Sequence, residues 1–180
     1  APSKVLFRFD DNFDNDVFRK SLSSRSFDTI VVSVPGKNIY EAVFFISREH
    51  KKKINKRRGK VVFLIEDGDP VSILVGDKNS QFIAQSDGLL KLIEEEFGCC
   101  VNGMCYKVFN NRIGLVYNGD ISHEQYCQIL SSMQANCFAS SNLVVGADRV
   151  LLPENKKGES VFSFETTSIT VNDLSVRGRA

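Results

Sequence analysis

The chain has 180 residues, of which 42% are hydrophobic and 25% are charged, and its formal net charge is +1. This composition is ordinary for a globular domain, and so small a net charge excludes a partner selected by overall charge. No apolar run approaches the ~20 residues of a membrane-spanning helix, and no charged-then-apolar leader opens the sequence. We therefore expect no membrane partner, no signal peptide and a location in the cytoplasm.

The first third of the chain predicts three strands that alternate with helices. Apolar runs at residues 4–9, 29–34 and 60–65 each stop at a polar or Pro-Gly turn, which is typical of buried strands. Asp14 is placed to cap a short helix that ends near residue 22. Asn38 is placed in the same way before a helix with a broad apolar face.

Residues 71–98 combine an ambiguous apolar run with a predicted helix. The run at 71–75 fits either an extended segment or the start of a helix, and both alternatives stay open. Residues 80–97 predict a single helix that contains Gly88, at a cost of about 1 kcal/mol relative to alanine. Gly98 follows as a plausible C-cap.

A strand, a helix and a second strand are predicted between residues 113 and 146. The apolar run 113–117 stops at a polar turn, and Ser122 with Gln125 forms the pattern of a capping box at the start of a helix. A second apolar run covers residues 142–146. A unit of this length implies two parallel strands, and parallel strands bind ligands at their carboxyl ends.

Together the five strands predict an α/β domain over residues 1–150 with a mostly parallel sheet. A closed barrel of this class needs eight strands and typically ~250 residues, so the prediction is a partial, TIM-like barrel. After residue 146 the pattern changes, because residues 148–159 are loop-like, residues 161–171 alternate like a β-hairpin and residues 172–180 look like a tail. We expect residues 151–180 to pack on the domain or on a partner.

Several segments between residues 60 and 146 resemble the carboxyl half of the nicotinamide phosphoribosyltransferases, which are type II phosphoribosyltransferases built on an α/β barrel. The segments follow the order of that family with nearly its spacing. They are VVFLIEDGDP at 61–70, LLKLIEEEFG at 89–98, VNGMCYKV at 101–108, IGLVYNGD at 113–120 and FASSNLVVG at 138–146. The resemblance implies the barrel fold and covers about half of such an enzyme, without a counterpart of the part that carries the catalytic histidine.

The resemblance also implies where a ligand would bind, and the chain departs from the family there. The family has Arg-Pro-Asp-Ser-Gly after the third strand, with the Arg on phosphate and the Asp near the ribose and nicotinamide, whereas this chain has leucine at position 64 and Glu66-Asp67-Gly68. A leucine offers no charge and no hydrogen-bond donor to a phosphate. After the second strand the family's Ser-Asp-Ser is replaced by Ser33-Val34-Pro35, which removes an acidic group.

The last two strand ends depart from the family as well. Asp120 lies one residue later than the family's aspartate, and the glycine-rich phosphate turn is replaced by Gly146-Ala147-Asp148-Arg149. An aspartate there repels phosphate, although Arg149 could compensate. If the family site survives, its ligand-binding residues are expected to be Glu66, Asp67, Gly68, Asp120, Gly146 and Arg149. No catalytic residue, cofactor or metal is assigned.

Two other features have alternative interpretations. The basic run 48–60 could bind nucleic acid, but cations also suit the carboxyl end of a helix and solvent, which is the interpretation we favour. Its candidate nucleic-acid residues are Lys51, Lys52, Lys53, Lys56, Arg57 and Arg58. The five cysteines show no paired zinc spacing, which favours reduced thiols.

Three hypotheses follow. The preferred one is a non-catalytic relic of the barrel that serves as a structural or interaction component of a larger assembly or homo-oligomer. Genes of this family occur in large bacteriophages, and a chain beginning at Ala1 suits a virion protein matured by proteolysis. The second is a subunit of a split enzyme that another chain completes, and the third is a nucleic-acid-binding module.

Overall fold

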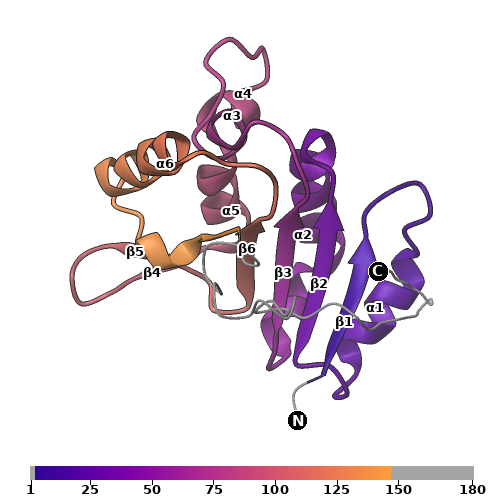
Figure 1. Cartoon of the computed structure of the whole chain (residues 1–180). Helices are drawn as coiled ribbons and strands as arrows, with labels where there is room; N and C mark the ends of the chain where they lie inside the picture. Colours follow the sequence, from indigo (N-terminus) through magenta and orange to yellow (C-terminus); the bar gives the residue numbers. More distant parts are fainter. Residues whose placement is uncertain (1–2, 147–180) are drawn as a thin grey trace, which may run out of the picture.

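The computed structural model describes residues 3–146, and these form an α/β unit around one parallel sheet (Figure 1). The sheet contains β1 (Lys4–Arg8), β2 (Thr29–Val34), β3 (Lys60–Ile65), β6 (Ile113–Tyr117) and β7 (Val144–Val145), in the order β1-β2-β3-β6-β7. All neighbouring pairs are parallel. The five predicted parallel strands are therefore confirmed.

Helices α1 (Asn15–Ser23) and α2 (Ile39–Lys56) follow the first two strands. The predicted cap of α1 is confirmed, because the Asp14 side chain accepts the N–H groups of Asp16 and Val17. Asn38 occupies the N-cap position of α2 as predicted, but its side chain makes no capping hydrogen bond. A short 3₁₀ turn, η1 (Gly36–Asn38), leads into the helix instead.

The segment after β3 contains three helices: α3 (Pro70–Leu74), α4 (Ile83–Asp87) and α5 (Leu89–Phe97). The open question at residues 71–75 is thus resolved as a helix. The single helix predicted over residues 80–97 is wrong, because Gly88 adopts φ +97° and separates α4 from α5. A Cβ on Gly88 would lie 2.6 Å from the carbonyl oxygen of Val75, so both the conformation and the close approach require glycine. Gly98 does end α5, as expected.

Helix α6 (His123–Ala135) begins with the predicted capping box between Ser122 and Gln125. The strand predicted at residues 142–146 is shorter than expected, since Asn142 ends a 3₁₀ turn, η2 (Ser140–Asn142). Its side chain accepts the N–H of Phe109 and donates to the carbonyl of Lys107. Asn142 thereby ties η2 to the neighbouring hairpin.

That hairpin is antiparallel and was not predicted. It pairs β4 (Cys99–Val101) with β5 (Lys107–Phe109) in a separate two-stranded sheet. The sequence contains one signal for it, the turn-forming dipeptide Asn102-Gly103 between two short apolar stretches.

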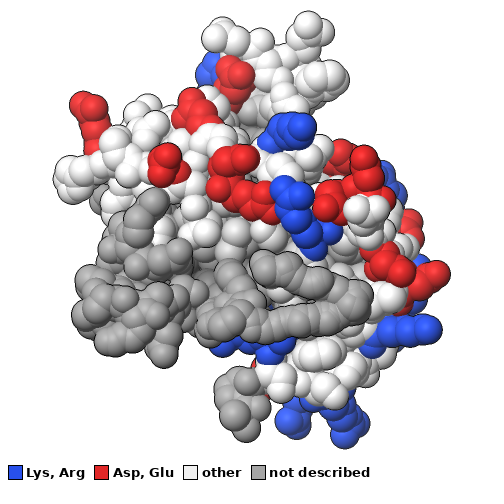
Figure 2. Space-filling view, turned by 45° about the vertical axis from the view of Figure 1, so that its right-hand side comes forward, with Lys and Arg blue, Asp and Glu red and all other residues white. Residues whose placement is uncertain are grey.

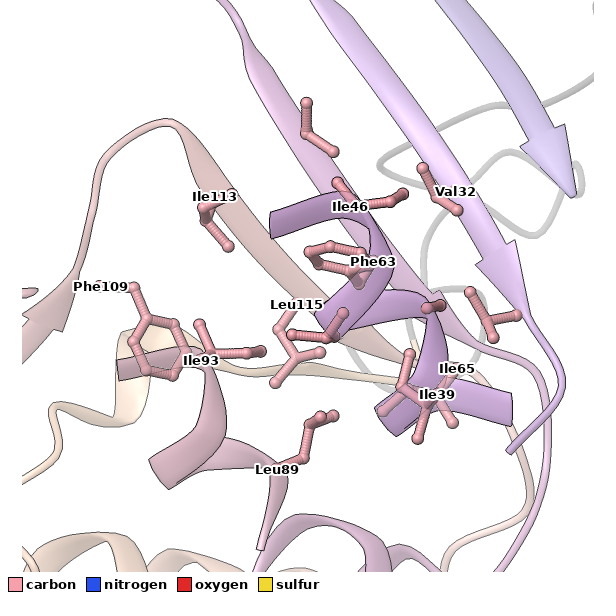
Figure 3. Packing of buried hydrophobic residues seen from close by; sticks show 14 of the residues in the cluster. Val32, Ile39, Ile46, Phe63, Ile65, Leu89, Ile93, Phe109, Ile113 and Leu115 are labelled. Atoms are coloured by element: carbon pink, nitrogen blue, oxygen red, sulfur yellow. The ribbon is translucent and has the colours of Figure 1, made fainter. Parts of the chain in front are cut away.

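The main core lies between the sheet and helices α1, α2 and α5, which cover one face of the sheet (Figures 1 and 3). Alternate residues of each strand point to this side, among them Val32, Phe63, Ile65 and Leu115. Figure 3 shows them packed against Ile39 and Ile46 of α2 and Leu89 and Ile93 of α5. This alternation is what a sheet with helices on that side requires.

The other residues of the strands form a second apolar face, which we call the inner face. It consists of Leu6, Val31, Val62, Leu64 and Val116, all buried. Strands added in sequence order, with helices on one side, form the arrangement of an α/β barrel segment, whereas a doubly wound sheet reverses direction and carries helices on both sides. The predicted fold class is confirmed in this respect.

Some expectations fall on parts of the chain that are not described. The domain boundary at residue 151, the hairpin over 161–171, the tail and Arg149 all lie outside residues 3–146. Among the helices of the described part, none has both the length and the apolar character needed to cross a bilayer.

The buried His50 makes the stability of this fold depend on pH. His50 on α2 is 1% exposed, contacts the rings of Phe18 and Phe45, and hydrogen-bonds to Asn15 through Nε2, while Nδ1 has no partner. Burial lowers the pKa of His50, and the charges of Arg19 and Lys53 act in the same direction. The unfolded chain therefore takes up the proton first as pH falls below about 6.5, and stability decreases there.

We expect the melting temperature to fall as pH is lowered from about 7.5 to about 5.5, the range in which histidine titrates. The fall should be smaller in His50→Gln, which cannot take up the proton in either state. His123→Gln is the matched control, because His123 is the other histidine of the chain and is exposed. Equal pH slopes in the wild type and His50→Gln would contradict the assignment.

Candidate functional site

Polar side chains follow the inner face at the carboxyl ends of its strands. Arg8, Ser33 and Glu66 each lie two residues after an inner-face residue, so strand alternation brings them to the same side. Arg8 and Ser33 are register partners across β1 and β2. The sheet thus places a polar cluster at the edge where parallel sheets bind ligands.

The cluster is held together by direct hydrogen bonds. Arg8 donates from Nε to Oε2 of Glu66 and from Nη2 to Oε1, each at 2.8 Å. Ser33 donates its hydroxyl to Oε2 of Glu66 at 2.7 Å. Both carboxylate oxygens are engaged, and the two-point contact with the guanidinium fixes their orientation.

These contacts set the ionisation of Glu66. Burial alone would raise the pKa of Glu66, but the hydrogen bonds from Arg8 and Ser33 outweigh it and hold the pKa below its ordinary value. The hydrogen bond to Glu66 raises the pKa of Arg8. Glu66 is therefore a charged, paired carboxylate near neutral pH, and it is a poor proton acceptor.

The next two carboxylates stabilise the turn after β3. Asp67 accepts the N–H of Gly36 at 2.8 Å, and a Cβ on Gly36 would lie 2.1 Å from the carbonyl oxygen of Asp67. Asp69 caps α3 by accepting the N–H of Val71 at 3.1 Å and the hydroxyl of Ser72 at 2.9 Å. These two acidic groups hold backbone in place, as turn aspartates commonly do.

The ends of β3 and β6 are joined through a buried tyrosine. The hydroxyl of Tyr117 donates to the carbonyl oxygen of Gly68 and lies 3.4 Å from that of Asp120. A Cβ on Gly119 would lie 2.6 Å from the Tyr117 hydroxyl, so the turn after β6 requires glycine at this contact. Beside it lies an open hollow of about 650 Å³, the carboxyl-end hollow, lined by Gly68, Asp69, Pro70, Asp120, Ile121, Ser122 and Gln125.

The structure therefore brings together much of the predicted site. Glu66, Asp67 and Gly68 lie at the end of β3, and Asp120 lies opposite Gly68. Gly146 ends β7, with φ +53° and an N–H that donates to the carbonyl of Tyr117 at 2.9 Å. Sequence reasoning missed Arg8. The signal for it was its position two residues after Leu6, at the carboxyl end of a strand.

The basic run lies at the opposite end of the sheet, where α2 ends and β3 begins. Figure 2 shows lysine and arginine side chains gathered at the bottom of the molecule, while acidic side chains concentrate toward the other end. Lys51, Lys52, Lys53 and Lys56 are exposed, as the favoured interpretation requires. Arg57 is an exception, because it is only 9% exposed.

The cysteines are free thiols: Cys99 is partly buried and Cys100, Cys105, Cys127 and Cys137 are exposed. Cys127 contacts His123 one helical turn away, at 3.4 Å between Sγ and Nε2. Within residues 3–146 no group of three or more potential ligand side chains is placed to hold a metal ion.

Comparison with known proteins shows similarity to part of the nicotinamide phosphoribosyltransferases. The chain is 40% identical over 88 residues to that enzyme from Acinetobacter baylyi, covering 48% of this chain and 17% of the enzyme. It is 30% identical over 82 residues to the Mycoplasma pneumoniae enzyme, covering 46% and 18%. A longer match, 25% identical over 164 residues, covers 87% of this chain and 31% of the Xanthomonas campestris enzyme.

The chain thus spans less than a third of the length of these curated relatives. No protein-family profile matches it. The resemblance seen in the sequence is confirmed as a partial nicotinamide phosphoribosyltransferase-like segment.

The Arg8–Glu66 contact should be energetically coupled. In a double-mutant cycle with Arg8→Ala and Glu66→Gln, measured by urea unfolding near pH 7, we expect a coupling free energy of about 1 kcal/mol, the upper part of the range for partly exposed pairs. Since the pKa of Glu66 is lowered in the fold, this stabilisation is present above the ordinary value of 4.5 and is lost as pH falls through the lowered value.

The exposed pair Arg19–Asp16, with N···O 2.6 Å on one helix, is the matched control. Its cycle should give a coupling of about 0.3 kcal/mol. Equal coupling for the two pairs would show that the Glu66 cluster is no more than a surface ion pair.

Proposed function

We propose that this nicotinamide phosphoribosyltransferase-like segment is a non-catalytic barrel wall that functions by assembling with other protein surfaces. The observation that carries the proposal is the closed cluster of Arg8, Ser33 and Glu66. Glu66 stands where the related enzymes have the aspartate near the ribose and nicotinamide. Both of its oxygens are already occupied by groups of the chain itself.

The position matched to the phosphate-binding arginine supports the same conclusion. Leu64 is 4% exposed and belongs to the apolar inner face, with Val31 and Val116. Its register partners on the two neighbouring strands are Ser33 on β2 and Val116 on β6. This part of the wall offers packing surface where the related enzymes offer a charged donor.

An edge of the sheet supports the assembly role. Within the described residues β1 pairs with β2 alone, so its other edge presents backbone donors and acceptors. Proteins normally cover such an edge with another element or another chain. We propose that a second copy or a partner protein pairs there or completes the barrel, in the cytoplasm or in a virion.

The carboxyl-end hollow favours a second candidate, a subunit of a split enzyme. Asp120 and Gly68, two of the residues suggested by the resemblance, line it, and the capped start of α6 opens onto it at Ser122. A partner chain that supplies the missing groups could complete a phosphate site there, because helix starts favour anions.

Calorimetry tests whether the carboxyl-end hollow of this chain binds a ligand of the related enzymes. The full chain is titrated with nicotinamide mononucleotide and, separately, with phosphoribosyl pyrophosphate plus magnesium. The barrel-wall proposal predicts no binding at the carboxyl-end hollow, so any saturable heat should be the same in the wild type and in Asp120→Asn, which alters the wall of that hollow. Sedimentation of the same sample should show a species larger than the monomer, alone or after a partner is added.

Micromolar binding of either ligand that is weakened in Asp120→Asn would overturn the non-catalytic proposal. If that binding is weakened in Asp120→Asn and unchanged in Asp16→Asn, an exposed aspartate on α1 far from the hollow, the split-enzyme candidate takes its place. Asp16→Asn removes one negative charge, as Asp120→Asn does, but it does not alter the wall of the carboxyl-end hollow.

A further inference from the structure

A pocket at the amino-terminal end of the sheet is separate from the carboxyl-end site. It has a volume of about 540 Å³ and lies between the end of α1, the segment before β2 and the segment between α2 and β3. This size is within the range of small-molecule sites. We call it the amino-end pocket; its walls are formed by Leu22, Ser23, Ser24, Arg25, Phe27, Asp28, Lys53, Lys56, Arg57, Arg58 and Gly59.

The charge of the wall is strongly one-sided. Five of these residues are basic and one, Asp28, is acidic. The whole chain carries a formal net charge of only +1, so the pocket concentrates positive charge that the sequence balances elsewhere. A recess lined by charge of one sign focuses the field and raises the local concentration of the opposite ion.

Arg57 gives the pocket a buried and incompletely paired cation. Its side chain is 9% exposed and donates from Nη2 to the carbonyl oxygen of Phe27, whereas Nε and Nη1 have no hydrogen-bond partner. Burial lowers the pKa of Arg57, and nearby Asp28 only partly opposes this effect. Buried donors without partners are costly, and those of a charged group most of all.

The exposed side chains around Arg57 are suited to a ligand. Lys53, Lys56 and Arg58 are exposed, and Lys53 lies 3.4 Å from the hydroxyl of Ser23. Nε and Nη1 of Arg57 are buried, so a ligand reaches them only when neighbouring side chains move. Arginine with flanking lysines and serine hydroxyls is a donor set that matches a phosphate group.

We propose that the amino-end pocket binds a phosphate group, with Arg57 at its base and Lys53, Lys56 and Arg58 closing around the anion. The apolar side chains of Leu22 and Phe27 in the same wall would contact an organic part of the ligand. A small phosphorylated molecule or a nucleic-acid phosphate could supply the group, and the two sources are distinguished below. The site is independent of the barrel-wall role.

The test is calorimetry on the full chain with inorganic phosphate and pyrophosphate at constant ionic strength set with chloride. We expect saturable binding, tighter for pyrophosphate because it carries more charge. Lys53→Ala/Lys56→Ala should weaken it roughly tenfold or more, since each lost charged hydrogen bond has a large effect. Arg57→Gln should abolish it, with circular dichroism to confirm that the variant is folded.

Lys51→Ala/Lys52→Ala is the matched control. It removes two lysines from the same helix, both exposed and neither in the pocket wall, so the change in net charge is the same. Affinity should stay within about twofold of the wild type, because exposed charges at a distance are screened. No saturable binding, or equal weakening by the two double variants, would overturn the proposal.

A short single-stranded oligonucleotide, followed by fluorescence anisotropy, identifies the source of the phosphate. If it competes with pyrophosphate and follows the same order of variants, backbone phosphate occupies the pocket. The alternative is that pyrophosphate binds as predicted, the oligonucleotide does not compete with it, and the affinity for the oligonucleotide is unchanged in Lys53→Ala/Lys56→Ala. In that case the ligand is a small phosphorylated molecule. Both results support the site and differ only in what fills it.

Discussion

The burial of β2 and β3 on both faces is the constraint on which the rest of the structure depends. On β3, five consecutive residues from Val61 to Ile65 are buried, and they divide between the helical core and the inner face. A strand of this kind cannot shift its register by one residue without exchanging its two apolar sets. The register then fixes the height at which every strand ends. Arg8, Ser33 and Glu66 meet because their strands end together.

The same constraint explains how the turns at the carboxyl end are built. Once β3 and β6 are fixed, their following turns must pass close to each other and to the end of β2. Glycines make this approach possible at Gly36 and Gly119, and the buried hydroxyl of Tyr117 joins Gly68 to Asp120. Asp67 and Asp69 therefore serve first as acceptors for backbone N–H groups. What remains for a ligand is the hollow beside Asp120.

The sequence was informative where local chemistry decides the structure. Strand runs, the Asp14 cap and the capping box of α6 follow from neighbouring residues alone, and all were predictable. Gly88 was misjudged because its penalty in a helix is small, whereas its close contact with Val75 is a tertiary fact. Of the candidate site, the strand-end carboxylates could be named in advance. The pairing of Arg8 with Glu66 and the burial of Arg57 could not, because each depends on residues distant in sequence.

The charged side chain at the carboxyl end of the sheet is fully paired, whereas the one at the amino end is not. This difference affects which ligands each end can bind. At the carboxyl end Glu66 has an arginine and a serine on its two oxygens, and the inner face below it is apolar at Leu64. An arginine at position 64 would bring a charge among buried valines, at a cost that packing alone does not offset.

At the amino end Arg57 keeps two unpaired nitrogens among four other cationic side chains. A group already neutralised by its own chain gains little from a ligand, whereas an unpaired buried cation gains a partner. Among the described residues, an anion would therefore be stabilised most at the amino-terminal end of the sheet. Parallel barrels usually carry their active sites at the opposite, carboxyl-terminal end.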